Sequence, residues 1–387
     1  MRGLLITPGV LLLAALLMAG CKPSTQTAPG ETTPAQPSPP TTGPRSPTTE
    51  PGKPATELKA VKSFATATKV ELFDIALSPD GATAVAGGED YGVGPHLWDT
   101  AGRKVIVWEG ADVAEYFRQS TMIPIYSLDG TRLWTVTGVS VGGSANGIIA
   151  VNTKTHKIEA AFPATASSDC LALSPDEKLL ATGSAVYDLK SKKPQFEFGK
   201  DQKDQREIAF SHDGKTLVGR GKNAITIWTV ETGMVSHTIP FKVASYLDEN
   251  YHFLAVSPKA NVFALSTGKE KDAVVEIRDL GTSEVKETFG RGLNLQPGRL
   301  SWSPDGKYLT VVEDLGYVKN EFRIAFWLLD ATSGKPVASL GPTPNNVYAI
   351  AFSGDGSKLA IITKPRKDKL DDEIAELVLW DLTKLSK

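Results

Sequence analysis

The chain contains few of the residues that usually reveal chemistry in a sequence. Only two of its 387 residues are cysteines, Cys21 and Cys170, and five are histidines. Two cysteines form one disulfide at most, which excludes a fold held together by a disulfide framework. No pair of histidines has the spacing of metal ligands, and the sequence contains neither a Gly-x-Ser-x-Gly motif nor a phosphate-binding loop. The sequence therefore presents no catalytic or metal-binding motif, and no cofactor is predicted.

The charge is nearly balanced, which argues against a further class of partner. The chain has 42 Lys and Arg against 44 Asp and Glu, a formal net charge of −2. No basic stripe or block of Lys and Arg is present, so nucleic acid is not expected as a partner. The acidic run at residues 371–373 has the residue types that bind calcium. It lies beside Lys367 and Lys369, however, which favours a solvated and internally compensated loop.

What the sequence does contain is a repeat. An apolar run, a tight turn with the sequence Ser-Pro-Asp-Gly or a variant of it, and a second apolar run recur along the chain. Pro, Asp and Gly suit the successive corners of a hairpin turn, so each copy predicts a β-hairpin. The turns begin at Ser78, Ser127, Ser174, Ser211, Ser257, Ser303 and Ser353, and successive serines are 37 to 50 residues apart. These spacings suit four short strands per copy, as in the blades of a β-propeller.

A third β-run follows each hairpin and often ends in an aromatic residue and an acid. The clearest copies end in Trp98-Asp99 and Trp380-Asp381, and Trp228 holds the same place in another copy. These copies resemble the WD-repeat family of β-propellers over roughly residues 57–387. The family's Gly-His pair is missing from every copy, so a divergent bacterial form and a related propeller with Ser-Pro-Asp-Gly turns both stay open. The resemblance implies an all-β fold, a seven-bladed β-propeller of four-stranded blades.

The two ends of the propeller segment predict how the ring closes. The seventh copy stops after its third strand, residues 377–382, with too few residues left for a fourth. Residues 58–65 precede the first hairpin and have the pattern of a strand. Pairing of these two segments would complete the seventh blade and remove an open sheet edge. We therefore predict a monomeric propeller closed by its N-terminal strand.

Residues 1–20 are predicted to be a secretion signal, because Arg2 precedes an apolar run, residues 10–18, that is too short to span a bilayer. Residues 17–21, Leu-Met-Ala-Gly-Cys, resemble the bacterial lipoprotein box. This resemblance implies cleavage before Cys21, acylation of its thiol and anchoring in a lipid bilayer. Ordinary signal cleavage, with Cys21 incidental, is the alternative. Lys22 is not an acidic inner-membrane retention signal, which favours the outer membrane or a periplasm-facing place in the cell envelope over the inner membrane.

Residues 21–56 are predicted to be a disordered tether between the acylated cysteine and the propeller, residues 57–387. Ten prolines and nine threonines lie between residues 22 and 56, with almost nothing large and apolar. Such a segment cannot bury enough surface to offset the entropy of ordering it.

With Cys21 acylated, Cys170 has no disulfide partner. Its place in an apolar first strand predicts a buried packing residue rather than a nucleophile.

Loop length gives the best indication of a binding face. Connections between second and third strands are long at residues 87–95, 138–147, 313–321 and 363–376, and insertions on one face of a repeat array often mark the binding face. The alternative is that loop lengths vary without functional consequence, because extra loop residues cost little free energy, and this explains the same pattern. Strand aromatics such as Trp302, Phe352 and Phe210 are predicted to pack between blades instead. The candidate protein-binding residues on the loops are Asp90, Tyr91, Tyr246, Tyr251, Arg291, Tyr317, Lys319 and Arg366.

The functional hypothesis is a non-catalytic scaffold. It describes a membrane-anchored extracytoplasmic lipoprotein whose propeller binds one or more protein partners that the sequence does not name. The alternative is an enzymatic or ligand-binding propeller of the lactonase or quinoprotein type, with a metal or cofactor in the central channel. That alternative needs acidic, Asn or His side chains from several blades to converge at the channel mouth, where the first strands offer mostly apolar and hydroxyl residues. The fold alone does not decide between the two.

Overall fold

Nearly all the regular structure among the described residues is β-strand. The computed structural model describes residues 56–57, 62–65, 71–89, 96–101, 104–106, 121–137, 141, 147–164, 170–241, 253–268, 272–296, 300–318, 321–343, 345–365, 376–383 and 385. These residues belong to one compact unit. A single 3₁₀ turn, η1 (Lys200–Gln202), is the only helical element among them, and no helix in this part of the chain is long and apolar enough to cross a bilayer. The predicted signal peptide, Cys21 and the tether up to residue 55 lie outside the described residues.

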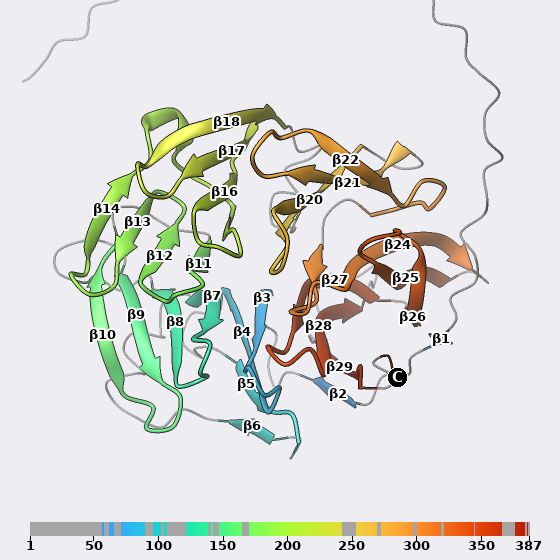
Figure 1. The fold of residues 1–387 in the computed structure, drawn as a ribbon. Helices are drawn as coiled ribbons and strands as arrows, with labels where there is room; N and C mark the ends of the chain where they lie inside the picture. The colour runs from blue at the N-terminus through green and yellow to red at the C-terminus, as the bar shows by residue number, and fades with distance from the viewer. Residues whose placement is uncertain are drawn as a thin grey trace, which may run out of the picture. The chain divides into compact units, whose positions relative to one another are not determined.

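The strands form seven four-stranded blades arranged in a ring (Figure 1). The prediction of a seven-bladed β-propeller is confirmed. Within each blade the neighbouring strands are antiparallel, and Figure 1 shows the first strand toward the centre of the ring and the last at its rim. The strands of blades one to seven, in order, are β3 (Glu71–Leu77), β4 (Thr83–Glu89), β5 (His96–Asp99) and β6 (Lys104–Ile106); β7 (Thr121–Tyr126), β8 (Arg132–Thr137), β9 (Gly147–Asn152) and β10 (Ile158–Pro163); β11 (Leu171–Leu173), β12 (Leu179–Thr182), β13 (Ala185–Asp188) and β14 (Lys193–Glu197); β15 (Glu207–Phe210), β16 (Thr216–Arg220), β17 (Ala224–Thr229) and β18 (Met234–Pro240); β19 (Leu254–Val256), β20 (Val262–Thr267), β21 (Val274–Asp279) and β22 (Val285–Phe289); β23 (Ser301–Trp302), β24 (Tyr308–Val318), β25 (Glu321–Asp330) and β26 (Pro336–Thr343); and β27 (Asn345–Phe352), β28 (Lys358–Pro365), β29 (Glu376–Asp381) and β2 (Lys62–Ala65).

The ring closes through the N-terminal part of the propeller, as predicted. Strand β2 pairs antiparallel with β29, from Lys62 opposite Leu379 to Ala65 opposite Glu376, and completes the seventh blade. A second pairing was not predicted from the sequence. Strand β1 (Thr56–Glu57) lies parallel to β26 of blade six. The segment before the first hairpin therefore joins the outer edges of two adjacent blades.

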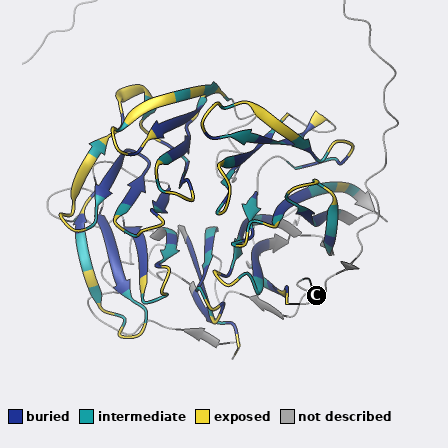
Figure 2. Cartoon of the chain, in the orientation of Figure 1, coloured by how far each residue is buried: buried dark blue, intermediate teal, exposed yellow. Residues whose placement is uncertain are grey.

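The apolar core is divided among the spaces between neighbouring blades (Figure 2). Between blades three and four, for example, Leu217, Trp228 and Phe198 are all buried, and Phe198 stacks on Trp228 with ring centroids 4.5 Å apart. Cys170 belongs to the same cluster and forms no disulfide, which confirms the prediction that it is a buried packing residue. Outer strands such as β18 keep most of their side chains in solvent. Each blade is thus stabilised mainly by the faces it shares with its two neighbours.

The prediction of a loop at residues 313–321 is wrong for most of its length. Strand β24 continues to Val318 and pairs with β25 from Glu321 onward, so blade six has a longer hairpin than its neighbours. A β-bulge lies between Asp314 and Gly316, and Gly316 has φ +65° there. The residues at this bulge resemble loop residues in the sequence, which explains the wrong prediction. Strands β4 and β28 likewise extend to Glu89 and Pro365. Most other residues of the four predicted loops lie outside the described residues.

Candidate binding site at the turn face

The seven serine turns lie at the same end of the ring, because each joins the first strand of a blade to the second. We call this end the turn face and the opposite end the loop face. In six turns the buried serine hydroxyl donates a hydrogen bond to the Asp two residues later at 2.6 or 2.7 Å. The same hydroxyl accepts the backbone N–H five residues later at 2.9 Å. In the fifth turn, which lacks the Asp, Ser257 Oγ accepts the N–H groups of Ala260 at 3.1 Å and Lys259 at 3.4 Å.

These hydrogen bonds keep the turn aspartates ionised. The hydroxyl of Ser127 and the backbone N–H of Thr131 donate to Asp129, which lowers the pKa of Asp129 to about 2. A hydrogen bond from its own serine likewise lowers the pKa of Asp176 to about 2, and the pKa of Asp80 is lowered for the same reason. At neutral pH the six turns that have an Asp therefore present carboxylates to solvent at the turn face.

Neighbouring turns contact one another at Pro79. The carbonyl of Pro79 in the first turn accepts the N–H of Asp355 in the seventh at 2.8 Å. The seventh turn has Gly354 where most copies have Pro, and a Cβ at this position would lie 2.9 Å from Cα of Pro79. On the other side a Cβ at Gly130, which has φ +70°, would lie 3.2 Å from the Pro79 ring. Glycine at these two positions thus lets the turns of blades seven, one and two pack side by side.

Two side chains extend this contact between blades. Glu177 occupies the glycine position of the third turn at φ +55°, a conformation that non-glycine residues seldom adopt. Its carboxylate accepts the backbone N–H of Leu128 in the second turn. Lys358 of blade seven donates to the carbonyl of Gly81 at 2.7 Å and to the hydroxyl of Thr100 at 3.2 Å, both in blade one. The turn face is therefore held as a connected surface.

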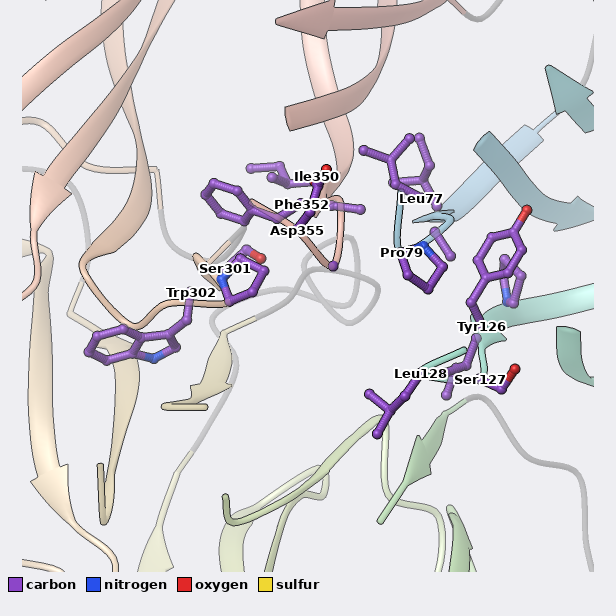
Figure 3. Close-up of a pocket in the computed structure, with 17 residues that line it drawn as sticks. Leu77, Pro79, Tyr126, Ser127, Leu128, Ser301, Trp302, Ile350, Phe352 and Asp355 are labelled. Atoms are coloured by element: carbon purple, nitrogen blue, oxygen red, sulfur yellow. The ribbon is translucent and has the colours of Figure 1, made fainter. Parts of the chain in front are cut away.

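Four blades line an open pocket of about 620 Å³ at this face (Figure 3). Its walls are first strands and turns of blades one, two, six and seven. Figure 3 shows Pro79 and Leu128 on one side and Trp302 and Phe352 on the other. Ligand pockets in proteins commonly have volumes of about 300 to 1,000 Å³ and mostly apolar walls. In size and chemistry this pocket is suited to apolar groups.

No protein-family model matches the chain, and no curated protein matches it. Among the residues that the structure describes, no group of three or more His, Cys, Asp or Glu side chains is placed to hold a metal ion. The turn carboxylates are each engaged by the serine and backbone N–H groups of their own turn. What this arrangement offers a ligand is a preformed apolar recess with anionic groups at its edge.

Of the binding residues predicted on the loops, the structure describes Arg291 and Tyr317, and neither lines this pocket. Asp90, Tyr91, Tyr246, Tyr251, Lys319 and Arg366 lie outside the described residues. Arg291 is exposed in the turn after β22. Tyr317 belongs to β24, in the extended hairpin of blade six, rather than to a loop. The prediction of a binding surface on the loop face stays a prediction.

Sequence reasoning missed the pocket although it found the turns that form it. Trp302 and Phe352, predicted as packing residues, also line the pocket, and Trp302 donates from Nε1 to the carbonyl of Ala255 at 3.1 Å. Leu128 follows the serine of a degenerate turn copy and is 68% exposed. A large apolar residue in a turn position that is Pro or Gly in five other copies was the available signal.

The loop face of the described residues has one buried ion pair. Arg220 Nε donates to Glu207 Oε2 at 2.9 Å, and their side chains are 1% and 6% exposed. Glu207 also accepts the backbone N–H groups of Phe253 at 2.6 Å and Leu254 at 3.1 Å, at the start of the first strand of blade five. The Arg220 guanidinium lies over the Phe253 ring, 5.2 Å from its centroid. These contacts attach blade five to blade four.

Proposed function

We propose that this chain is a membrane-anchored extracytoplasmic lipoprotein, and that its propeller, of a divergent WD-repeat type, is a scaffold that binds protein partners without catalysing a reaction. The pocket at the turn face is the observation that carries the binding role. It is a recess of about 620 Å³ walled by four blades, with Leu128 68% exposed at its edge. Partly exposed apolar anchors beside a preformed pocket are typical of sites where one protein inserts a side chain into another.

The turn contacts support a scaffold role further. The turns of blades seven, one, two and three are connected by the Pro79 carbonyl, by the close approach of Gly354 and Gly130 to Pro79, and by the carboxylate of Glu177. A wall held in this way changes little when a ligand enters, so little free energy is spent on ordering it. Support for the anchor comes from the lipoprotein box at residues 17–21, which ends in Cys21. Attachment by two or more acyl chains would hold the propeller stably at a membrane.

Photo-crosslinking in cells that make the protein tests the binding role. A photoreactive residue replaces Leu128 at the pocket or, as the matched control, Met234, which is 69% exposed on outer strand β18. We expect a discrete protein adduct from position 128 and none of the same size from position 234.

Substitution of Cys21 tests the lipid anchor. Cys21→Ser should release the protein from the membrane fraction or leave an unprocessed precursor, whereas Lys22→Ser, which keeps the thiol, should not.

Three results would count against the proposal. Identical adduct patterns at positions 128 and 234 would remove the evidence for a specific partner at the pocket. Unchanged processing and membrane fractionation of Cys21→Ser would remove the lipid anchor. A stoichiometric calcium or transition metal in the purified, dialysed protein would favour the enzymatic or ligand-binding alternative over a scaffold.

A further inference from the structure

We propose that the outer turns of blades two and three contact the headgroups of an anionic phospholipid bilayer and so orient the propeller against it. These turns, residues 152–157 and 188–193, join the third strand of each blade to the fourth, and we call them the basic rim. Because neighbouring strands are antiparallel, they lie at the turn face. The inference rests on the proposed membrane anchor, which brings the rim to a bilayer. Two independent features lead to it, the charge of the rim and its backbone conformation.

Lysine is unevenly distributed among the outer turns. In blades two to six these turns have the same geometry, since the N–H of the fifth residue donates to the carbonyl of the first. The turns of blades four and five have no lysine, and that of blade six has one, Lys335. Figure 1 shows the strands that carry the basic rim, β9, β10, β13 and β14, on one side of the ring. The rim has five exposed lysines: Lys154, Lys157, Lys190, Lys192 and Lys193.

The carboxylates near the basic rim are already engaged. The turns of the same two blades and the strands beside them contain Asp129, Glu159, Asp176, Glu177 and Asp188. Glu159 pairs with Arg132 at 2.7 Å, and Asp176 pairs with Lys178 at 3.0 Å. The other three carboxylates accept hydrogen bonds from backbone N–H groups. None of the five rim lysines forms an ion pair with a residue that the structure describes. The basic rim therefore has an excess of positive charge in solvent.

The backbone of the rim gives independent support. The fifth residue of each outer turn has a positive φ, which suits Gly233 and Gly334 in blades four and six. In the basic rim this residue is His156 at φ +56° or Lys192 at φ +58°, a conformation that is unfavourable for a residue with a side chain. Residues held in such conformations often occur at functional sites. Ser283 of blade five, at φ +63°, has the same strain without a charge and serves as a control below.

The composition of the rim suits a lipid surface better than a protein partner. Protein interfaces are depleted in lysine and enriched in aromatic residues, Met and Arg. The two rim turns contain no Trp, Tyr, Phe, Met or Arg, and none of the large exposed apolar residues of the described chain lies in them. Clustered lysines, in contrast, are attracted to anionic lipid headgroups without needing a shaped pocket.

Such a contact gives the anchored protein an orientation. The predicted tether, residues 22–56, has 35 residues and at about 3.1 Å per residue can span on the order of 100 Å. An acyl anchor on so long a segment does not fix which side of the propeller meets the bilayer. The basic rim would turn blades two and three toward it. Alone the contact is weak and reversible, whereas an acyl chain and a basic patch together attach a protein stably.

Vesicle co-sedimentation tests the contact without the acyl anchor. The protein is the chain from residue 21 onward with Cys21→Ser, so that neither an acyl group nor the signal peptide contributes. Vesicles of phosphatidylcholine alone are compared with vesicles of an equal mixture of phosphatidylcholine and phosphatidylglycerol, at low and at physiological salt. We expect binding to the mixed vesicles only, with an affinity that falls several-fold as salt rises, because salt screens exposed charges.

Two matched pairs of variants locate the contact. Lys193 and Lys335 are exposed lysines at the sixth position of the outer turns of blades three and six. Lys193→Ser should weaken binding to the mixed vesicles by about fivefold, and Lys335→Ser should leave it unchanged. Lys192→Gly and Ser283→Gly both relieve a left-handed conformation, so both should raise the melting temperature. Only Lys192→Gly should also weaken vesicle binding, again by about fivefold.

Several results would overturn the inference. Equal binding to the two kinds of vesicle, or no binding to either, would do so. Equal losses in Lys193→Ser and Lys335→Ser, or in Lys192→Gly and Ser283→Gly, would show that the basic rim is not the contact. Salt-sensitive binding to immobilised polyglutamate without binding to vesicles would replace the bilayer by an acidic protein partner.

These outcomes are distinguishable from failure of the proposed function. A discrete crosslink from position 128 in cells, together with no vesicle binding, would overturn the rim contact and leave the scaffold role intact. The anchor is judged on membranes washed at high salt, which removes a contact made by lysines alone. Unchanged fractionation of Cys21→Ser after that wash would count against the anchor, while the vesicle measurements would still decide on the basic rim.

Discussion

At the residue scale, a serine and an aspartate two positions apart determine the shape of each inner hairpin. The serine hydroxyl is buried and has both a hydrogen-bond acceptor and a donor within its own turn in six copies. The copy at Ser257 has lost the Asp yet keeps the serine buried, at 2% exposed. Serine is therefore the constant part of the turn. The aspartate stabilises the turn by accepting a hydrogen bond from the serine hydroxyl, which would otherwise be buried without an acceptor.

This difference between the turns gives a test with a built-in control. Ser211→Ala removes the hydrogen bond to Asp213 and leaves the N–H of Thr216 without its side-chain acceptor, so we expect unfolding to become easier by about 1 to 3 kcal/mol. Ser257→Ala removes only two longer bonds, at 3.1 and 3.4 Å, and should cost less. Urea denaturation of the two variants provides the comparison. Equal losses would show that the aspartate contributes nothing.

At the scale of strands and blades, the sequence predicts those elements that are determined by residues close together in the chain. The seven hairpins, the closing strand and the buried Cys170 follow from local turn residues and apolar patterns, and the structure has them. The strand pairing of residues 313–318 was missed because a glycine such as Gly316, which lies at a bulge, suggests in the sequence that the strand ends there. Strand β1 is two residues long and pairs with β26, some 280 positions later, so no local pattern marks it. The pocket was missed for a related reason: its walls come from blades one, two, six and seven, which closure brings together.

Contacts between strands of different blades also set the stability of their junctions. Glu207 accepts hydrogen bonds from Arg220 and from the start of blade five, and both charges are buried. We expect Glu207→Gln to destabilise the fold by about 3 to 5 kcal/mol, because it removes the buried negative charge that pairs with Arg220 and binds the start of blade five. The matched control is Glu159→Gln, whose pair with Arg132 is exposed and should contribute about 0 to 1 kcal/mol. Thermal unfolding of the two variants distinguishes them, and similar melting temperatures would show that the buried pair does not hold blades four and five together.

At the scale of the whole propeller, closure and the candidate site depend on each other. Blades one and seven are at opposite ends of the repeat and meet only when the ring is closed. Their turns then share the hydrogen bond from Asp355 N–H to the Pro79 carbonyl and the contact of Lys358 with Gly81. Phe352 and Pro79 face the same pocket from these two blades. Opening the ring should therefore remove the pocket as well as lower the stability.

Two truncations separate the contributions of β1 and β2. A chain that starts at residue 61 loses the two-residue parallel pairing with β26 but keeps β2, so it should stay monomeric with a melting temperature close to that of the intact propeller. A chain that starts at residue 67 also loses β2, which exposes the edge of β29 along the buried residues Leu377, Leu379 and Trp380. An unpaired apolar edge promotes association, so this chain should melt at least several degrees lower, form oligomers on size-exclusion chromatography with light scattering, and lose binding at the turn-face pocket. If the two truncated chains melt and elute alike, β2 does not close the ring, and the junction of blades one and seven must be held by the turn contacts and by the apolar cluster that the two blades share.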